Sequence, residues 1–145
     1  MASKIKSYEF LKHTADAKFR AYGKDLEEAF ANAAYATIDI ITDHKKVKAK
    51  VKKQFEIESE DQKALLYDFL EKIVVLVDTD NFLISKVEEV KIKQVDEGFE
   101  LSAKFSGDNV IENYEIKTTI KAATYQEMEI EKTKDKVMLQ AVLDI

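Results

Sequence analysis

The spacing of apolar residues changes along this chain, and that change constrains the fold more than any other feature. In the first half, two segments repeat apolar residues with the period of an α-helix, one starting at Asp25 and one ending within residues 78–81. From Phe82 onward, apolar and polar residues alternate in short runs, as is typical of strands. This order predicts an α+β layered sandwich, with two helices packed on a mainly antiparallel sheet.

Capping signals mark where the two predicted helices begin. Asp25 and Glu28 form a variant of the capping box, and Ser59 with Gln62 forms another. The polar run 78–81 is expected to end the second helix. Strands are predicted at residues 8–11, 18–22, 47–57, 82–84, 87–95, 99–105, 114–120, 125–131 and 137–143. Hairpin turns are predicted at 96–98 and 106–109.

Length and composition restrict the classes of function. With 145 residues, the chain is expected to form a single domain, 1–145. It contains no cysteine, which excludes disulfides, thiolate metal sites and cysteine nucleophiles. Its two histidines cannot build a histidine-rich zinc site. The net charge of −5 does not favour gripping RNA phosphates by bulk charge.

Targeting signals are not apparent in the sequence. The first ten residues, MASKIKSYEF, lack the apolar segment of a signal peptide. The longest apolar run, residues 73–77, is far too short to cross a bilayer. A cytoplasmic location is therefore expected.

One basic segment, residues 45–53, places lysines at alternate positions of a predicted strand. They could form a ridge that contacts RNA or a protein partner, or they could line a solvated strand face. No aromatic residue is interleaved with them, so the stacking platform of a single-strand binder is missing. The solvated strand face is the favoured interpretation.

Three segments in order resemble the archease family. Residues 9–16 read EFLKHTAD, close to the family's EFLEHTAD, and residues 21–30 read AYGKDLEEAF, with Asn32-Ala33-Ala34 following. Residues 121–125 read KAATY, similar to the family's KAVTYH, and the sequence finishes on aspartate and one aliphatic residue, as the family does. Two positions depart from the pattern: Gln126 stands where histidine is common, and Ala17 where valine is common.

The resemblance implies an archease-like fold and a role that is not enzymatic. Archeases assist the manganese- and GTP-dependent RNA ligase RtcB, which joins tRNA halves after intron removal. The family promotes guanylylation of the ligase and permits its multiple turnover. The implied partner is therefore an RtcB-type ligase, and RNA is reached only through it.

The resemblance also implies a divalent-metal site built from Asp16, Asp144 and the terminal carboxylate of Ile145. Oxygen ligands favour hard cations, so Ca²⁺ is expected, with Mg²⁺ or Mn²⁺ as alternatives. His13 and Lys121 are candidates for supporting the site or contacting the ligase. The competing interpretation is that Asp16 caps a turn and Asp144 is solvated at a frayed end.

Two other functions are compatible with the same residues. The carboxylates could hold the catalytic ion of a metal-dependent phosphoester hydrolase, although His13 is the one evident general base. Alternatively, the chain could be a chaperone-like binding module whose metal is structural.

Overall fold

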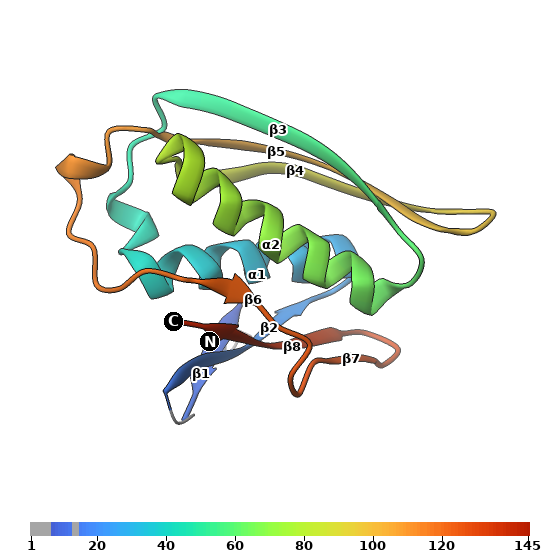
Figure 1. The fold of residues 1–145 in the computed structure, drawn as a ribbon. Coiled ribbons are helices and arrows are strands. Elements are labelled where there is room, and N and C mark those ends of the chain that lie inside the picture. The colour runs from blue at the N-terminus through green and yellow to red at the C-terminus, as the bar shows by residue number, and fades with distance from the viewer. Residues whose placement is uncertain (1–6, 13–14) are drawn as a thin grey trace, which may run out of the picture.

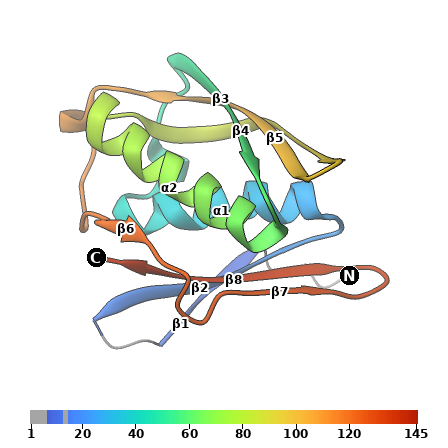
Figure 2. The ribbon, with the colours of Figure 1, turned by 45° about the vertical axis from the view of Figure 1, so that its right-hand side comes forward.

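Two helices lie between two antiparallel sheets in the computed structural model, which describes residues 7–12 and 15–145 (Figure 1). The helices are α1 (Leu26–Ile41) and α2 (Gln62–Asp80), and two short 3₁₀ turns are η1 (His44–Lys46) and η2 (Ile111–Asn113). The three-layer arrangement is visible in Figure 2 as well. The structure therefore confirms the predicted α+β class. The prediction named one sheet, whereas the antiparallel strands form two sheets, one on each side of the helices.

The first sheet runs along the lower side of the molecule in Figure 1 and has the strand order β1-β2-β8-β6, with β7 also paired to β8. Its strands are β1 (Tyr8–Leu11), β2 (Asp16–Gly23), β6 (Ala122–Ala123), β7 (Glu129–Lys132) and β8 (Val137–Asp144). The second sheet has the order β3-β5-β4 and consists of β3 (Val51–Ser59), β4 (Leu83–Val95) and β5 (Gly98–Asp108).

Buried aromatic rings join the layers. Phe30 of α1 and Phe69 of α2 lie with ring centroids 5.3 Å apart. Phe69 also meets Phe55 of β3 at 5.9 Å and Phe105 of β5 at 6.4 Å. Phe19 of β2 is fully buried and adds the first sheet to the same core. The helices therefore bury their two opposite sides, one against each sheet.

The first helix begins as its sequence predicts. The side chain of Asp25 accepts a hydrogen bond from the Glu28 backbone N–H at 2.8 Å. Glu28 in turn accepts one from the backbone N–H of Lys24 at 2.9 Å. Donors at the start of α1 are thus satisfied by the two acidic side chains that carry the capping signal.

The predicted cap of the second helix is wrong. Strand β3 continues through Ser59, and Asp61 caps α2 by accepting a hydrogen bond from Ala64 N–H at 2.8 Å. The Ser59 hydroxyl instead donates to Asp68 at 2.6 Å. The predicted end of α2 is confirmed, because Asn81 follows Asp80 with a left-handed φ of 53°.

The turn predicted at 106–109 is also wrong. Ser106, Gly107 and Asp108 belong to β5, the central strand, and Gly107 is paired with both Val51 and Ile84. A Cβ on Gly107 would lie 2.0 Å from the Leu83 carbonyl oxygen, so the glycine here allows close strand approach. The hairpin predicted at 96–98 is confirmed between β4 and β5.

Residues 114–120 do not form the predicted strand. This segment crosses the end of α1, where Lys117 N–H donates to the Ile41 carbonyl and the Thr42 hydroxyl donates to the Glu115 carbonyl, each at 2.7 Å. Bonding to a helix end replaces the ladder that a strand would need. The predicted strands 82–84 and 87–95 form one strand, β4, interrupted by bulges.

The strand predicted at 47–57 is β3, which begins later, at Val51, and ends later, at Ser59. Residues 47–50 connect η1 to it and are not part of the strand. The lysines at positions 45, 46, 48, 50 and 52 are all exposed. No helix in the described part of the chain is long and apolar enough to cross a membrane.

Candidate metal centre

Asp16 and Asp144 stand directly opposite each other where β2 pairs with β8. Successive side chains of a strand point to opposite faces, and Phe19 and Ala21 of β2 are buried against the helices. Asp16 and Asp144 therefore lie on the outer face of the first sheet. Side chains directly opposite in an antiparallel pair have Cβ atoms about 4.5–5.5 Å apart. The fold thus brings together two of the three residues expected to bind the metal.

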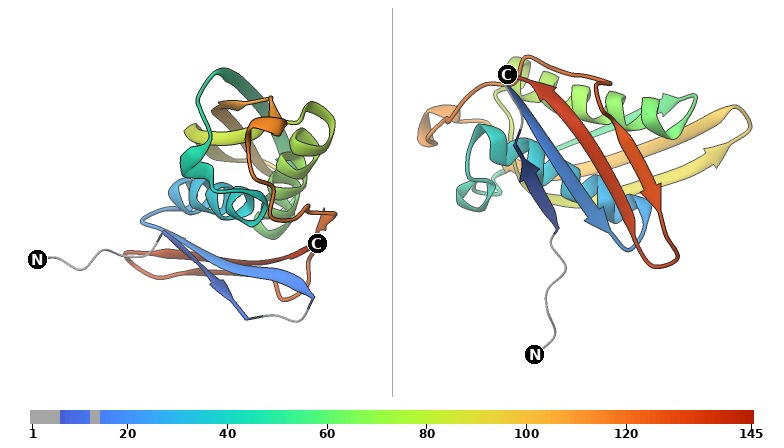
Figure 3. Two further views of the ribbon diagram at one scale, coloured as in Figure 1. Left: turned by 90° about the vertical axis from the view of Figure 1, so that its left-hand side faces the viewer. Right: turned by 90° about the horizontal axis from the view of Figure 1, so that it is seen from below.

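Asp144 is held on both sides, so it is not at a frayed end. Besides its pairing with Asp16, it is paired with Ala122 of β6. Its carbonyl accepts a hydrogen bond from the backbone N–H of Lys121 at 2.7 Å. Ile145 follows directly and packs partly buried against the core. Figure 3 shows β8 beside β2, with the C-terminus at the end of this pair.

The backbone that leads into Asp16 has an uncommon conformation. Ala15 has a φ of 64°, in the left-handed region that alanine seldom adopts. Such strained residues persist where surrounding structure fixes them, often beside functional sites. The regular pairing of β2 with β8 begins at the next residue, Asp16.

A nearby ion pair was not anticipated from the sequence. Lys18, two residues after Asp16 and on the same face of β2, contacts Glu127 at 3.0 Å between Nζ and Oε1. Glu127 belongs to the turn between β6 and β7, and its carbonyl accepts a hydrogen bond from Gln140 Nε2 at 2.7 Å. The alternation of side chains along β2 could have placed Lys18 on the same face as Asp16. No local sequence pattern indicates the turn that brings Glu127 to Lys18.

The residues present are chemically suited to a hard cation. The side chains of Asp16 and Asp144 carry carboxylate oxygens, the ligand type of Ca²⁺, Mg²⁺ and Mn²⁺. Across residues 7–12 and 15–145, no group of three or more His, Cys, Asp or Glu side chains is placed to hold a metal ion. A complete site therefore needs a donor besides the Asp16 and Asp144 side chains, and the family resemblance implies that Ile145 supplies it.

The residues expected to support the site, and the position that departs from the family pattern, differ in where they lie. His13 lies outside the described residues. The Lys121 backbone is beside Asp144, while its side chain is exposed. Gln126, which replaces the family's histidine, is exposed, and its backbone N–H donates to the Thr124 hydroxyl at 3.2 Å.

A second cluster of titratable groups lies at the end of α1. Asp39 accepts hydrogen bonds from the backbone N–H of His44 at 2.9 Å and from the Tyr8 hydroxyl, and its Oδ1 lies 2.9 Å from His44 Nδ1. Burial alone raises the pKa of Asp39, but the bonds from His44 and Tyr8 outweigh it and lower the pKa overall. Burial and the bond to Asp39 raise the pKa of Tyr8. The cluster joins β1, α1 and η1, and we interpret it as structural.

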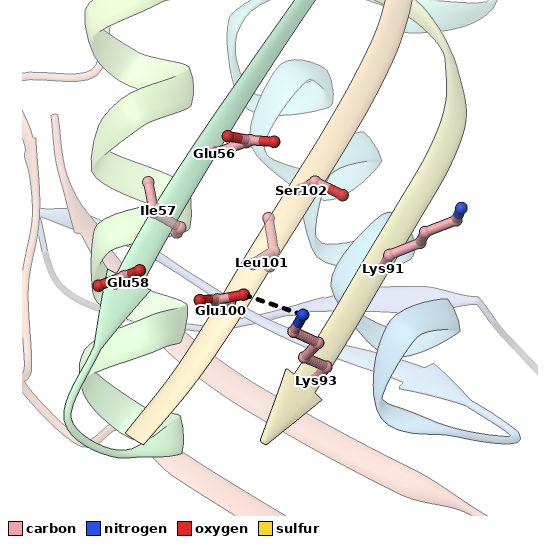
Figure 4. Close-up of a pocket in the computed structure, with 8 residues that line it drawn as sticks. All are labelled: Glu56, Ile57, Glu58, Lys91, Lys93, Glu100, Leu101 and Ser102. Atoms are coloured by element: carbon pink, nitrogen blue, oxygen red, sulfur yellow. Dashed lines mark ion pairs between the residues drawn. The ribbon is translucent and has the colours of Figure 1, made fainter. Parts of the chain in front are cut away.

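A shallow depression lies on the outer face of the second sheet (Figure 4). It encloses about 500 Å³ and is lined mainly by Glu56, Glu58, Lys91, Lys93 and Glu100. Lys93 and Glu100 form an ion pair at 3.5 Å. Its glutamates come from β3 and β5 and its lysines from β4. The helices separate this face from Asp16 and Asp144, so it is not part of the metal centre.

The fold and the paired carboxylates define a class: an α+β sandwich protein with two helices enclosed by antiparallel sheets and a candidate site for a hard divalent cation. The chain belongs to the archease family, because residues 8–145 match the model of the Archease protein family (MTH1598/TM1083). This confirms the resemblance found in the three sequence segments.

Individual relatives support the same assignment over nearly the whole chain. The protein archease of Methanothermobacter thermautotrophicus is 40% identical over 141 residues, covering 97% of this chain and 100% of the relative. That of Pyrococcus abyssi is 42% identical over 143 residues, covering 97% and 100%. A solution structure of Methanobacterium thermoautotrophicum protein 1598 superposes with a TM-score of 0.84 at 38% identity, again covering 97% and 100%.

Proposed function

We propose that this protein activates an RtcB-type tRNA-splicing RNA ligase, promoting ligase guanylylation and multiple turnover through a divalent cation held at the end of β8. The observation that carries the proposal is the pairing of Asp16 with Asp144 in a protein of the archease family. The role is that of an activator without catalytic activity of its own, and it places the protein in the cytoplasm with the ligase.

The pair of carboxylates explains why a cation would be bound here. Two like charges directly opposite in a ladder destabilise the strands that carry them. A cation between them removes that repulsion, and the terminal carboxylate of Ile145 would add a third oxygen donor. We propose Ca²⁺ as the ion, with Mg²⁺ and Mn²⁺ as alternatives.

The position of the two aspartates would allow a bound cation to be presented to the ligase. Asp16 and Asp144 occupy the outer face and the end of a sheet, so the ligase can approach them without disturbing the core. A bound cation supplies neutralisation of phosphate charge, which nucleotidyl transfer requires. His13 and Lys121 would flank the contact with the ligase. RNA would be engaged only through the ligase, since the net charge of this chain is −5.

The test is ligation by the cognate RtcB-type ligase under single- and multiple-turnover conditions, with and without this protein. Asp16→Ala and Asp144→Ala are each expected to abolish the gain in multiple turnover. Glu131→Ala is the matched control, because Glu131 is an exposed acidic residue of the same sheet, on β7. Full stimulation by the Asp144→Ala protein would contradict the proposal.

Two other outcomes would redirect the assignment. Phosphoester hydrolysis by the isolated wild-type protein would favour a metal-dependent hydrolase. Unfolding on chelation, without any effect on ligase turnover, would favour a binding module with a structural metal.

The role of Ile145 has its own test. One glycine added after Ile145 moves the terminal carboxylate and is expected to weaken cation binding measured by calorimetry.

A further inference from the structure

The two edges of the second sheet differ in how they are protected. On β4, two backbone donors are bonded by side chains of α1: Val87 N–H to the Tyr35 hydroxyl at 2.8 Å, and Ile92 N–H to Glu27 at 2.7 Å. Two bulges further interrupt this strand. Both devices prevent a sheet edge from pairing with another chain.

Strand β3 forms the opposite edge and has neither device. Its register with β5 is continuous from Val51 to Ser59. Within the described residues, no strand pairs with its outer side and no side chain bonds to its backbone. A long, regular edge strand of this kind offers a template for strand addition.

Charge is distributed unevenly along the outer face of β3. Lys50 directly precedes the strand and bonds the Gly107 carbonyl of β5 through its backbone N–H at 2.8 Å. Lys52 lies at the beginning of β3, Gln54 at its middle, and Glu56 and Glu58 towards its end, and all five side chains are exposed. Positive and negative charges are thus separated into two halves about Gln54. Lysines that only blunt an edge would not need this separation, because a single sign repels any neighbouring copy.

We propose that β3 pairs antiparallel with β3 of a second copy of this chain about a two-fold axis at Gln54, so that the two three-stranded sheets become one continuous sheet. In this register Lys52 lies opposite Glu56 of the second copy, and Lys50 lies opposite Glu58. The two-fold axis repeats both pairs, and opposite charges directly across a ladder are stabilising.

Other registers that keep each face aligned are less favourable. An axis at Glu56 places that glutamate against itself. A two-fold axis at Phe55 would place Lys52 opposite Glu58, but Glu56 would then face the uncharged Gln54. The pairing centred on Gln54 therefore makes the most opposite-charge pairs between residues 50 and 58.

The environment of Glu58 within one chain adds to the argument. Glu58 stands opposite Glu100 of β5, which is a like-charge pair, and Glu100 is already bonded to Lys93. Lys50 of the second copy would approach Glu58 from its open side and offset this repulsion. The joined surface lies on the second sheet, so the metal centre on the first sheet stays accessible in the dimer.

The first experiment is sedimentation velocity at low salt over about a hundredfold range of protein concentration, since a charged interface weakens with added salt. Lys52→Glu is expected to raise the dimer dissociation constant about tenfold or more, because symmetry applies the new repulsion twice. Combining Lys52→Glu with Glu56→Lys is expected to restore dimerisation. Lys91→Glu is the control, since it changes net charge equally on the exposed face of the protected strand β4.

A second measurement tests the register itself. The chain has no cysteine, so Q54C introduces a unique thiol, and the two thiols face each other across the axis. Q54C is expected to form an intermolecular disulfide faster than E58C, whose opposite residue is Lys50. Circular dichroism of each variant monitors folding. A wild-type protein that stays monomeric at every concentration, or a double charge variant that fails to restore association, would overturn the proposal.

Discussion

Asp16 and Asp144, near opposite ends of the sequence, face each other across the β2–β8 ladder. Sheet pairing fixes this proximity, because β2 and β8 are paired along their whole lengths from Asp16 to Gly23. The ladder fixes the two backbones directly opposite each other, so two side chains of like charge leave the sheet side by side. That geometry has a measurable consequence for stability.

Replacing Asp144 by Asn is expected to stabilise the metal-free protein while removing its response to a cation. Loss of one charge relieves a repulsion of about 0.2–1 kcal/mol across the strand pair. Thermal unfolding with chelator should show a higher melting temperature for Asp144→Asn than for wild type, and added Ca²⁺ should raise only the wild-type value. Glu131→Gln serves as the control and should behave as wild type. A Ca²⁺ response that persists in Asp144→Asn would argue against this site.

The Asp39 cluster is expected to contribute stability that depends on pH. Asp39→Ala removes an acceptor that bonds Tyr8 and His44, which should lower the free energy of unfolding by about 1–3 kcal/mol at neutral pH. Because folding lowers the pKa of Asp39, its contribution is present above the ordinary value of 3.8 and is lost as pH falls through the lowered value.

Urea unfolding of wild type and Asp39→Ala at neutral and acidic pH measures this difference. The gap between the two proteins should narrow below about pH 4. Asp78→Ala provides a control, since Asp78 is exposed near the end of α2 and its loss should change stability little. A gap that stayed constant down to the most acidic pH at which both fold would show that the charge of Asp39 is not responsible.

Local signals predicted the elements of this fold better than their connections. Strand 8–11, the cap at Asp25 and the end of α2 at Asn81 each depend on residues close in sequence, and the structure has all three. Division of the strands into two sheets depends on pairings between distant segments. Pairing of Asp16 with Asp144 also required this long-range register, which the family resemblance suggested and periodicity alone did not.

The cap of α2 illustrates how two local signals can compete. Ser59 with Gln62 satisfies the capping-box pattern, but Ser59 is paired with Phe99 in the ladder. Asp61 follows two residues later with extended backbone and bonds Ala64 N–H. Strand pairing therefore continued past the predicted boundary and left the cap to the next suitable side chain.

Asp61→Ala should lower stability by about 1 kcal/mol, because the first turn of α2 loses a bonded donor. Asp61→Asn should stay within a few tenths of a kcal/mol of wild type, since asparagine is an equally good cap. Chemical unfolding of the three proteins checks both values. Equal losses in the alanine and asparagine variants would indicate that the charge of Asp61, rather than its hydrogen bond, stabilises the helix.

Gly107 is the position where a misassigned turn has the largest energetic consequence. Glycine beside Ser106 and Asp108 has the composition of a hairpin turn, yet it lies in the central strand with neighbours on both sides. An added Cβ would lie 2.0 Å from the Leu83 carbonyl oxygen and 2.8 Å from the ring of Phe82, so β4 would have to shift.

Gly107→Ala is therefore expected to destabilise the protein at the upper end of about 1–3 kcal/mol, the range for overpacking a close contact. An exposed glycine whose backbone conformation alanine can adopt without a clash would instead gain about 0.4–1 kcal/mol of stability. Urea unfolding separates these outcomes, with Ser102→Ala in the same strand as a control expected within about 0.5 kcal/mol of wild type. Amide hydrogen exchange should also be faster in β3 and β4 of Gly107→Ala than in β2 and β8, because the displaced backbone belongs to the second sheet and the helices separate it from the first.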